Sequence, residues 1–128
     1  MSDWTNKPSD ISKYQGFVYI ITNKKTGKYY IGKKFFWSKR TLKPLKGKKR
    51  KRHRIVESDW ETYWGSSKKL LSDIDKYGKK AFTRNIIVPC ETKFDCAYWE
   101  LHFQMENKVL FDSDSYNGII NVRLMRKK

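Results

Sequence analysis

Residues 16–32 constrain the fold of this chain most strongly, because two runs of β-forming residues flank a polar turn. The first run, Phe17–Thr22, contains only aromatic and β-branched residues, which favour strands. The second run, Tyr29–Lys33, follows the turn-forming segment Asn23–Gly27. This pattern predicts an antiparallel β-hairpin.

The position of the turn decides which residues of the two strands face each other. A four-residue loop over 23–26 pairs Thr22 with Gly27 and places Tyr19 directly opposite Tyr30. Residues at opposed positions share one face of a sheet, about 5 Å apart. The two phenols are therefore expected to lie together, either as a simple packing pair or as part of a site. A register change of one residue would separate them.

The rest of the chain alternates helix and strand signals. In chain order, the sequence predicts a helix or tight aromatic turn from Phe35 to Arg40, a short helix from Ser58 to Trp64 with a capping box, a helix from Ser66 to Tyr77 with core residues Leu70, Leu71, Ile74 and Tyr77, a strand from Phe82 to Val88 stopped by Pro89, a helix from Asp95 to Asn107, and a tail over 116–124 with a short extended segment.

This order of elements predicts an α/β (α+β) fold with a small, mainly antiparallel three-stranded sheet flanked by helices. Residues 1–15 are expected to form a flexible or loosely docked lead-in. Residues 16–128 are expected to form a single domain with a basic insertion at about 41–57.

The charge of the chain indicates a polyanionic partner. Its 128 residues carry 29 Lys and Arg against 13 Asp and Glu, a net charge of +16. Such an excess favours binding to nucleic acid, with an anionic membrane surface as the alternative. No apolar run could span a bilayer, and the N-terminus lacks the apolar core of a signal peptide, so we expect action in a cytoplasm. Cys90 and Cys96 predict reduced, largely buried thiols rather than a zinc site.

The basic residues concentrate between Lys39 and Arg54, where ten Lys or Arg residues occur without an acid. We expect this block to be mobile when free and to bind the phosphate backbone, although a merely solvated run is the alternative. Nearby aromatic side chains at Phe35, Phe36, Trp37 and Trp60 could wedge between or stack on bases. The predicted DNA-binding residues are Lys33, Lys39, Lys43, Lys46, Lys48, Lys49, Arg50, Lys51, Arg52 and Arg54.

The hairpin triplets Phe17-Val18-Tyr19 and Tyr30-Ile31-Gly32 resemble the signature of GIY-YIG nucleases. Arg40 follows Tyr30 by ten residues, near the position of the family's active-site arginine on the helix after the hairpin. Glu100 lies on the predicted late helix and Asn117 near the end, as in the family. Segments 63–67 and 76–79 are similar to phage Seg-like members. The first triplet departs from Gly-Ile-Tyr, but its tyrosine is kept.

The resemblance implies a role for each of these residues. Tyr19 acts as general base or positions the attacking water, and Tyr30 contacts the same water or phosphate. Arg40 clamps the scissile phosphate, since its planar fork fits phosphate oxygens. Glu100 holds Mg²⁺ (or Mn²⁺), and Asn117 orients or braces the site.

Two of these expectations can be examined from residue chemistry alone. A phenol is a poor base at neutral pH, so a cation such as Lys33 or Lys39 is expected to promote ionisation of Tyr19. Glu100 shares a helix face with Cys96 and Phe103, which places its carboxylate at an apolar margin. There it either binds a cation or pairs with Lys or Arg. His53, inside the basic insertion, is not expected to be catalytic.

Together these features predict a Mg²⁺-dependent endodeoxyribonuclease acting on double-stranded DNA, related to bacteriophage homing endonucleases and active in the bacterial host cytoplasm. The chain leaves no room for a separate targeting domain, so specificity would come from the basic block or a targeting protein partner. The alternative is a catalytically inactive nucleic-acid-binding module of the same fold. A basic ribosome-associated protein is a third reading.

Overall fold

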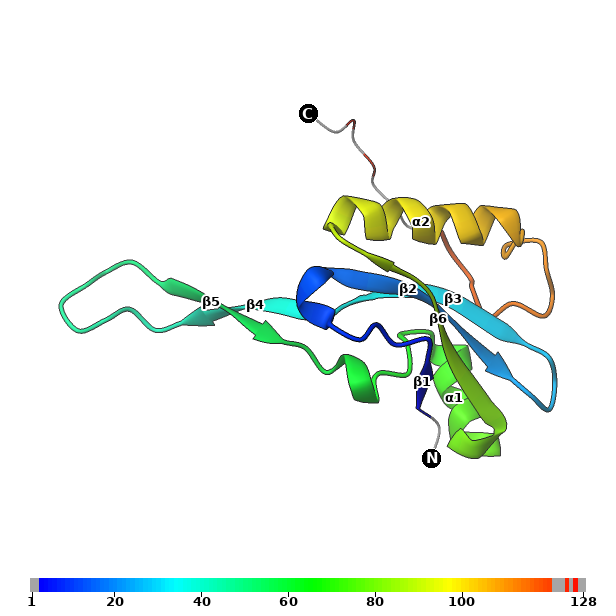
Figure 1. The fold of residues 1–128 in the computed structure, drawn as a ribbon. Helices are drawn as coiled ribbons and strands as arrows, with labels where there is room; N and C mark the ends of the chain where they lie inside the picture. Colours follow the sequence, from blue (N-terminus) through cyan, green and yellow to red (C-terminus); the bar gives the residue numbers. More distant parts are fainter. Residues whose placement is uncertain (1–2, 121–123, 125, 127–128) are drawn as a thin grey trace.

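The computed structural model describes residues 3–120 together with Leu124 and Arg126. Its centre is a four-stranded sheet in the order β1-β6-β2-β3 (Figure 1). These strands are β1 (Trp4–Thr5), β2 (Gly16–Asn23), β3 (Tyr29–Phe35) and β6 (Phe82–Cys90). Strand β2 is antiparallel to both β3 and β6, whereas β1 runs parallel to β6. The α+β class is confirmed, and the predicted three-stranded antiparallel sheet gains β1 as an edge strand.

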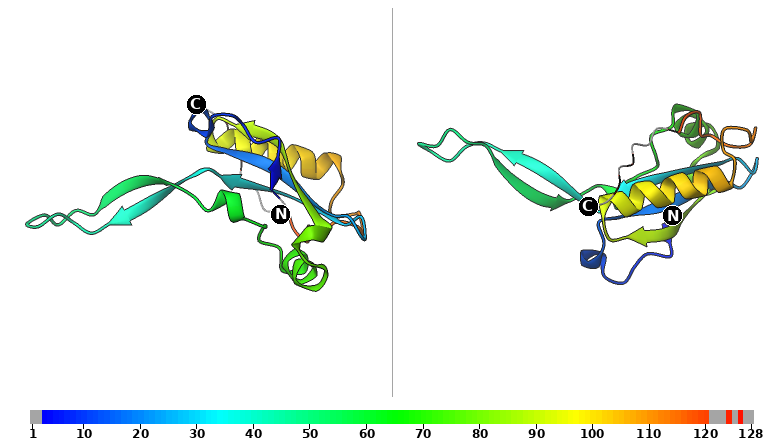
Figure 2. Two further views of the ribbon diagram at one scale, coloured as in Figure 1. Left: turned by 60° about the horizontal axis from the view of Figure 1, so that its bottom comes forward. Right: turned by 90° about the horizontal axis from the view of Figure 1, so that it is seen from above.

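Two helices cover opposite faces of the sheet, α1 (Lys68–Tyr77) on one side and α2 (Lys93–Glu106) on the other (Figures 1 and 2). Strand β2 is buried on both faces, which explains its nearly continuous apolar sequence. Phe17, Tyr19 and Ile21 join the core on the α1 side, whereas Val18 joins the core under α2. The alternation of β2 thus sends Tyr19 towards α1.

The hairpin is present, but its predicted register is wrong. Tyr19 pairs with Gly32, and Tyr30 pairs with Ile21. The four-residue turn begins one residue later than expected, because Asn23 stays in the strand and its N–H donates to the Lys28 carbonyl at 2.7 Å. A displacement of two positions preserves the faces. Tyr19 and Tyr30 therefore share a face, as predicted, but as a diagonal pair.

The segment after β3 differs most from expectation. Instead of a helix or tight turn, residues Trp37–Leu42 form strand β4, which pairs with β5 (Arg52–Glu57) in an antiparallel ribbon. Figures 1 and 2 show this ribbon extending away from the body of the protein. The backbone stays extended because Phe36 is fully buried and its N–H donates to the Gln15 carbonyl at 2.9 Å. The basic block expected to be mobile therefore contains two paired strands.

The predicted capping box at Ser58 is also wrong. The Ser58 hydroxyl donates instead to the Phe35 carbonyl at 2.6 Å and closes the base of the ribbon. The chain then forms a single 3-10 turn, η2 (Trp60–Thr62), with no side-chain cap. The Ser58 side chain is therefore directed at Phe35 across the ribbon and not at the N–H groups of the turn that follows.

The later elements agree closely with the sequence signals. Helix α1 is capped by Ser67 and ends before Gly78, although Leu71, expected in the core, is exposed. Strand β6 runs through Pro89 instead of stopping at Val88. Helix α2 begins two residues earlier than predicted, because the Thr92 hydroxyl accepts the Asp95 N–H at 3.1 Å. None of the described helices has the length and apolarity needed to cross a membrane.

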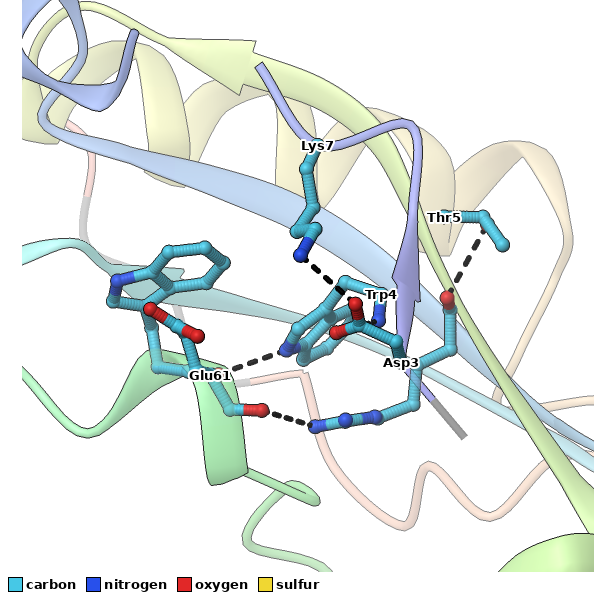
Figure 3. Close-up of polar contacts among 7 residues, drawn as sticks. Asp3, Trp4, Thr5, Lys7 and Glu61 are labelled. Carbon is cyan, nitrogen blue, oxygen red and sulfur yellow. Dashed lines mark hydrogen bonds and ion pairs between the residues drawn. The ribbon is translucent and has the colours of Figure 1, made fainter. Parts of the chain in front are cut away.

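The N-terminal segment is packed, not loosely docked. Trp4 is 3% exposed, and its indole N–H donates to the Trp60 carbonyl at 2.8 Å (Figure 3). A second 3-10 turn, η1 (Ile11–Lys13), precedes β2. This packing was not predicted because a lone Trp among polar residues carries no periodic signal. At the other end, the predicted extended segment of the tail falls largely outside the described residues.

Candidate active site

A cavity of about 450 Å³ opens beside the edge strand β3. It brings together Tyr19 and Tyr30 from the hairpin, Lys33 from β3 and Glu100 from α2. The remaining lining residues are Lys34, Phe35, Trp37, Ser38, Lys39, Ser58, Tyr63, Ser66 and Lys93. Residues from the first hairpin and from the last helix therefore converge at one edge of the sheet.

Gly32 makes this convergence possible. It lies opposite Tyr19 on the neighbouring strand, and the Tyr19 ring lies over it. A Cβ at residue 32 would lie 2.6 Å from the Tyr19 hydroxyl oxygen and 2.9 Å from Cε2 of Tyr30. With glycine there, the two rings approach to 6.2 Å between centroids. The last glycine of the second triplet thus leaves the space that the two phenols occupy.

Tyr63 is a third phenol in the cavity, and no role was predicted for it from the sequence. Its ring contacts the Tyr19 ring edge-on, with centroids 6.2 Å apart and planes at 85°. Arg84 holds the backbone there by donating to the Tyr63 carbonyl at 2.8 Å. Gly65, with φ of +90°, lets the chain turn close to the Tyr19 hydroxyl. The Tyr-Trp-Gly sequence is the one signal that could have suggested it.

The electrostatics of the phenols differ from the expectation. Burial raises the pKa of Tyr19 well above its ordinary value, and neighbouring Tyr63 and Tyr30 raise it further. Burial likewise raises the pKa of Tyr30, which shares a hydrogen bond of 3.4 Å with Ser66. Among the described residues no cation lowers the Tyr19 pKa, so the idea that Lys33 or Lys39 promotes its ionisation is contradicted. In the free protein the Tyr19 phenol is protonated.

Glu100 presents its carboxylate to the cavity from α2. Its side chain is 13% exposed, and Oε1 lies 3.2 Å from Nζ of Lys33. Burial raises the pKa of Glu100, and the Lys33 ammonium acts in the opposite direction. The sequence left two alternatives for this carboxylate, a bound cation or a pair with Lys or Arg. The structure is compatible with both, because the carboxylate is paired with a lysine and also faces an open cavity.

The side chains of the cavity fit a divalent cation that takes some of its ligands from the protein and others from a phosphate. Among the described residues, no three His, Cys, Asp or Glu side chains lie close enough together to enclose a metal ion. Mg²⁺ is commonly bound by only one or two carboxylates together with phosphate oxygens and water. Glu100 is the carboxylate in this cavity that would serve as the protein ligand, and a nucleic-acid phosphate would supply further oxygens.

Arg40 lies outside the cavity. It is exposed on β4, opposite Arg54, so its predicted position on a helix is wrong. The family-based expectation assumed a helix at a place where this chain forms a ribbon. Its role as a phosphate clamp stays a prediction.

Asn117 also lies away from the cavity, but it braces the strand that lines it. Its side-chain oxygen accepts the Ile31 N–H at 3.0 Å, and its amide donates to the Ile31 carbonyl at 2.9 Å. Gln104 of α2 donates to the same carbonyl at 3.1 Å. Both polar groups of the exposed edge of β3 at Ile31 are thus paired. Asn117 thus holds the backbone of β3 at Ile31, between Tyr30 and Gly32. This arrangement agrees with the bracing role expected of it.

The other candidate residues have simple surroundings. Lys39 lines the cavity, whereas the predicted DNA-binding residues from Lys43 to Arg54 are exposed along the ribbon and its loop. His53 is exposed in β5, and His102 lies 3.0 Å from Glu106 on the outer side of α2. Cys90 and Cys96 are free and buried, as predicted.

The Lys33–Glu100 pair leads to a testable prediction on the free protein. Because burial raises the pKa of Glu100 and Lys33 opposes this, Lys33→Met should raise that pKa further. Carbon-detected NMR titration of the glutamate carboxyls in the two proteins measures the change. Lys93→Met removes another cavity lysine that forms no ion pair with Glu100 and should leave its pKa nearly unchanged. Equal shifts in both variants would contradict a specific pair.

Comparison with known proteins agrees with this geometry. A family model described as "Putative endonuclease segE, GIY-YIG domain" matches residues 2–120. No curated protein and no solved structure gives a significant match. The matched region includes the N-terminal strand, the ribbon, the cavity and Asn117.

Proposed function

Since the chain belongs to the GIY-YIG endonuclease domain family, we propose that it is a divalent-metal-dependent endodeoxyribonuclease that hydrolyses phosphodiester bonds in double-stranded DNA. Family membership indicates a nuclease, and DNA follows as its substrate. The metal dependence, the duplex substrate and a homing-related bacteriophage role in a bacterial host cytoplasm are our proposals.

The convergence of Tyr19, Tyr30 and Glu100 in one cavity is the observation that supports this function most strongly. Phosphodiester hydrolysis needs a positioned water, a group that meets charge on the phosphate, and stabilisation of the leaving oxygen. Hydroxyls, four lysines and a carboxylate line this cavity together. The net charge of +16 favours association with DNA.

Each cavity residue can be given a role in this reaction. The protonated Tyr19 phenol accepts a hydrogen bond from the attacking water and orients it, which suits its raised pKa better than the role of a general base. The proton of that water then passes to a phosphate oxygen of the substrate or to solvent. Tyr30 contacts the same water or a phosphate oxygen. Lys33 lies beside the phosphate and holds the Glu100 carboxylate in place. A divalent cation on Glu100, when bound, neutralises phosphate charge and stabilises the leaving oxygen.

A nicking assay on supercoiled plasmid tests the proposal. Wild-type protein with Mg²⁺ or Mn²⁺ should convert the plasmid to open-circular or linear DNA, and EDTA should prevent this. Glu100→Gln keeps the size of the side chain but removes the charge, so cleavage should fall about a hundredfold or more. Glu106→Gln, on the same helix but outside the cavity, is the matched control.

Two outcomes would count against the assignment. Full cleavage by Glu100→Gln would show that Glu100 is not the ligand of an essential metal ion. DNA binding by the wild type without cleavage under any divalent metal would favour the alternative, an inactive nucleic-acid-binding module of the same fold. Specificity from a targeting protein partner would require that partner in the assay.

A further inference from the structure

The ribbon of β4 and β5, which we call the arm (residues 37–57), has no core of its own. Nearly all its residues are exposed, including Ile55 at 65%. Figures 1 and 2 show it projecting beyond the sheet and both helices. A two-stranded ribbon is only marginally stable by itself in water. Its length and exposure therefore need a reason outside the packed body of the protein.

The register divides the arm into two faces of different chemistry. Arg40 lies directly opposite Arg54, and Leu42 lies opposite Arg52. Because side chains alternate along a strand, these three arginines share one face. The other face carries Lys39 opposite Ile55 and Thr41 opposite His53. Guanidinium groups thus gather on one side of the ribbon.

The opposed arginines are unfavourable in the free protein, because like charges directly across a sheet repel. Within the described residues neither Arg40 nor Arg54 forms an ion pair. A polyanion would convert this repulsion into attraction. The cross-strand pair is therefore best explained by a ligand rather than by stability.

The base of the arm is fixed to the wall of the cavity. The Trp37 indole donates to the Tyr14 carbonyl at 3.0 Å, and the Ser58 hydroxyl to the Phe35 carbonyl at 2.6 Å. Trp37, Ser38 and Lys39 also line the cavity. Arg40 comes two residues after Ser38, or about 7 Å along the strand. A ligand bound to the arginine face would thus lie at a set distance from the phenols.

We propose that the arm inserts its arginine face into the major groove of duplex DNA and so fixes which phosphate enters the cavity. The major groove of B-DNA admits a two-stranded ribbon, and arginine forks pair with O6 and N7 of guanine there. The deep, narrow major groove of duplex RNA does not admit side chains in this way. This inference rests on the proposed function, because it supplies the positioning of the DNA that the same cavity cuts.

The test measures binding without cleavage, in the Glu100→Gln protein with EDTA. Replacing Arg40 and Arg54 together with Thr, a good strand former, should weaken binding to a short duplex DNA about tenfold or more. The melting temperature of this variant should stay equal or rise, because a repulsive pair is lost. The matched control is Lys24→Ala with Lys25→Ala, which removes two charges from the exposed turn at the far end of the hairpin and should bind nearly normally.

Methylation interference identifies the groove. Methylation of guanine N7, in the major groove, should weaken binding by the parent protein and not by the Arg40→Thr, Arg54→Thr variant. Interference from adenine N3 in the minor groove would overturn the proposal. The proposal would also fail if methylation interfered nowhere and the salt dependence of binding fell in the variant by an amount that corresponds to about two phosphate contacts. That result would indicate that the arginines bind the DNA backbone alone. Duplex RNA should compete poorly, and equal competition would also count against the arm.

The outcomes separate this inference from the proposed function. If methylation of guanine interferes with binding as expected but the wild-type protein never cleaves DNA, the nuclease assignment is wrong and the proposed role of the arm is supported. If the wild-type protein cleaves DNA with a metal ion and the arginine variant binds DNA normally, the nuclease assignment is supported and the proposed role of the arm is wrong.

Discussion

Replacing Tyr19 with Phe should lower the rate of plasmid cleavage about a hundredfold or more, while DNA affinity stays within a few fold of wild type. The substitution keeps the ring, which packs against Trp4, Phe17 and Tyr63, and removes only the hydroxyl. The free energy of unfolding should change by about 1 kcal/mol, since one buried hydrogen-bonding group is lost. Nicking rates, binding assays and urea unfolding measure the three quantities.

Tyr14→Phe provides the control for this prediction. Tyr14 is a half-buried phenol beside the same core but outside the cavity. Its variant should cleave DNA like the wild type. If Tyr19→Phe retained cleavage within about twofold, Tyr19 would be a packing residue and the proposed orientation of water would fail. A large loss of stability in Tyr19→Phe would make its lost activity uninformative, which is why unfolding is measured alongside.

Gly32→Ala should abolish cleavage and lower the free energy of unfolding by about 1 to 3 kcal/mol. The added methyl would approach Cζ of Tyr19 at 2.8 Å and Cε2 of Tyr30 at 2.9 Å, so one or both rings must move. Movement of either phenol by about 1 Å is enough to remove most of the rate. Gly32 has ordinary strand geometry, so the effect comes from space and not from backbone conformation.

A matched control and a double variant sharpen this prediction. Gly118→Ala adds the same methyl where nothing lies within 4 Å, and it should preserve stability and cleavage. Combining Gly32→Ala with Tyr19→Phe removes the closest atom, the hydroxyl oxygen at 2.6 Å. This double variant should regain part of the lost stability but no activity. Normal cleavage by Gly32→Ala would show that the rings adjust freely.

The sequence predicted well those features that depend on local pattern. Two runs of β-formers around a polar turn were enough for the hairpin, and the two helices begin at Lys68 and Lys93, each two residues from the predicted starts at Ser66 and Asp95. The pairing register was missed, because the turn could begin at Asn23 or one residue later. Asn23 stays in the strand with its side chain buried and donating to the Tyr116 hydroxyl, 93 residues away.

The site was predicted only in part, because some of its residues are positioned by contacts with distant parts of the chain. Tyr19, Tyr30 and Glu100 were found through the resemblance to the GIY-YIG family, and the cavity brings them together. Tyr63 was missed because its position depends on Arg84, a residue on a distant strand. Arg40 was expected on a helix because the family resemblance places its arginine there, and the short run after the hairpin has no clear period that would have argued for a strand. Its pairing with Arg54 requires a partner strand that lies beyond the basic loop over 43–51.

The stacking of Arg84 between Trp4 and Trp64 has a consequence for how the protein is made. The guanidinium carbon lies 4.6 Å and 4.3 Å from the two ring centroids, and the same arginine holds Tyr63 beside Tyr19. The cavity wall therefore needs both the start of the chain and strand β6, and Glu100 is synthesised later still. A growing chain on the ribosome exposes its basic residues long before it has a complete cavity. Cutting ability would thus arise only late in synthesis, once Glu100 has joined the cavity.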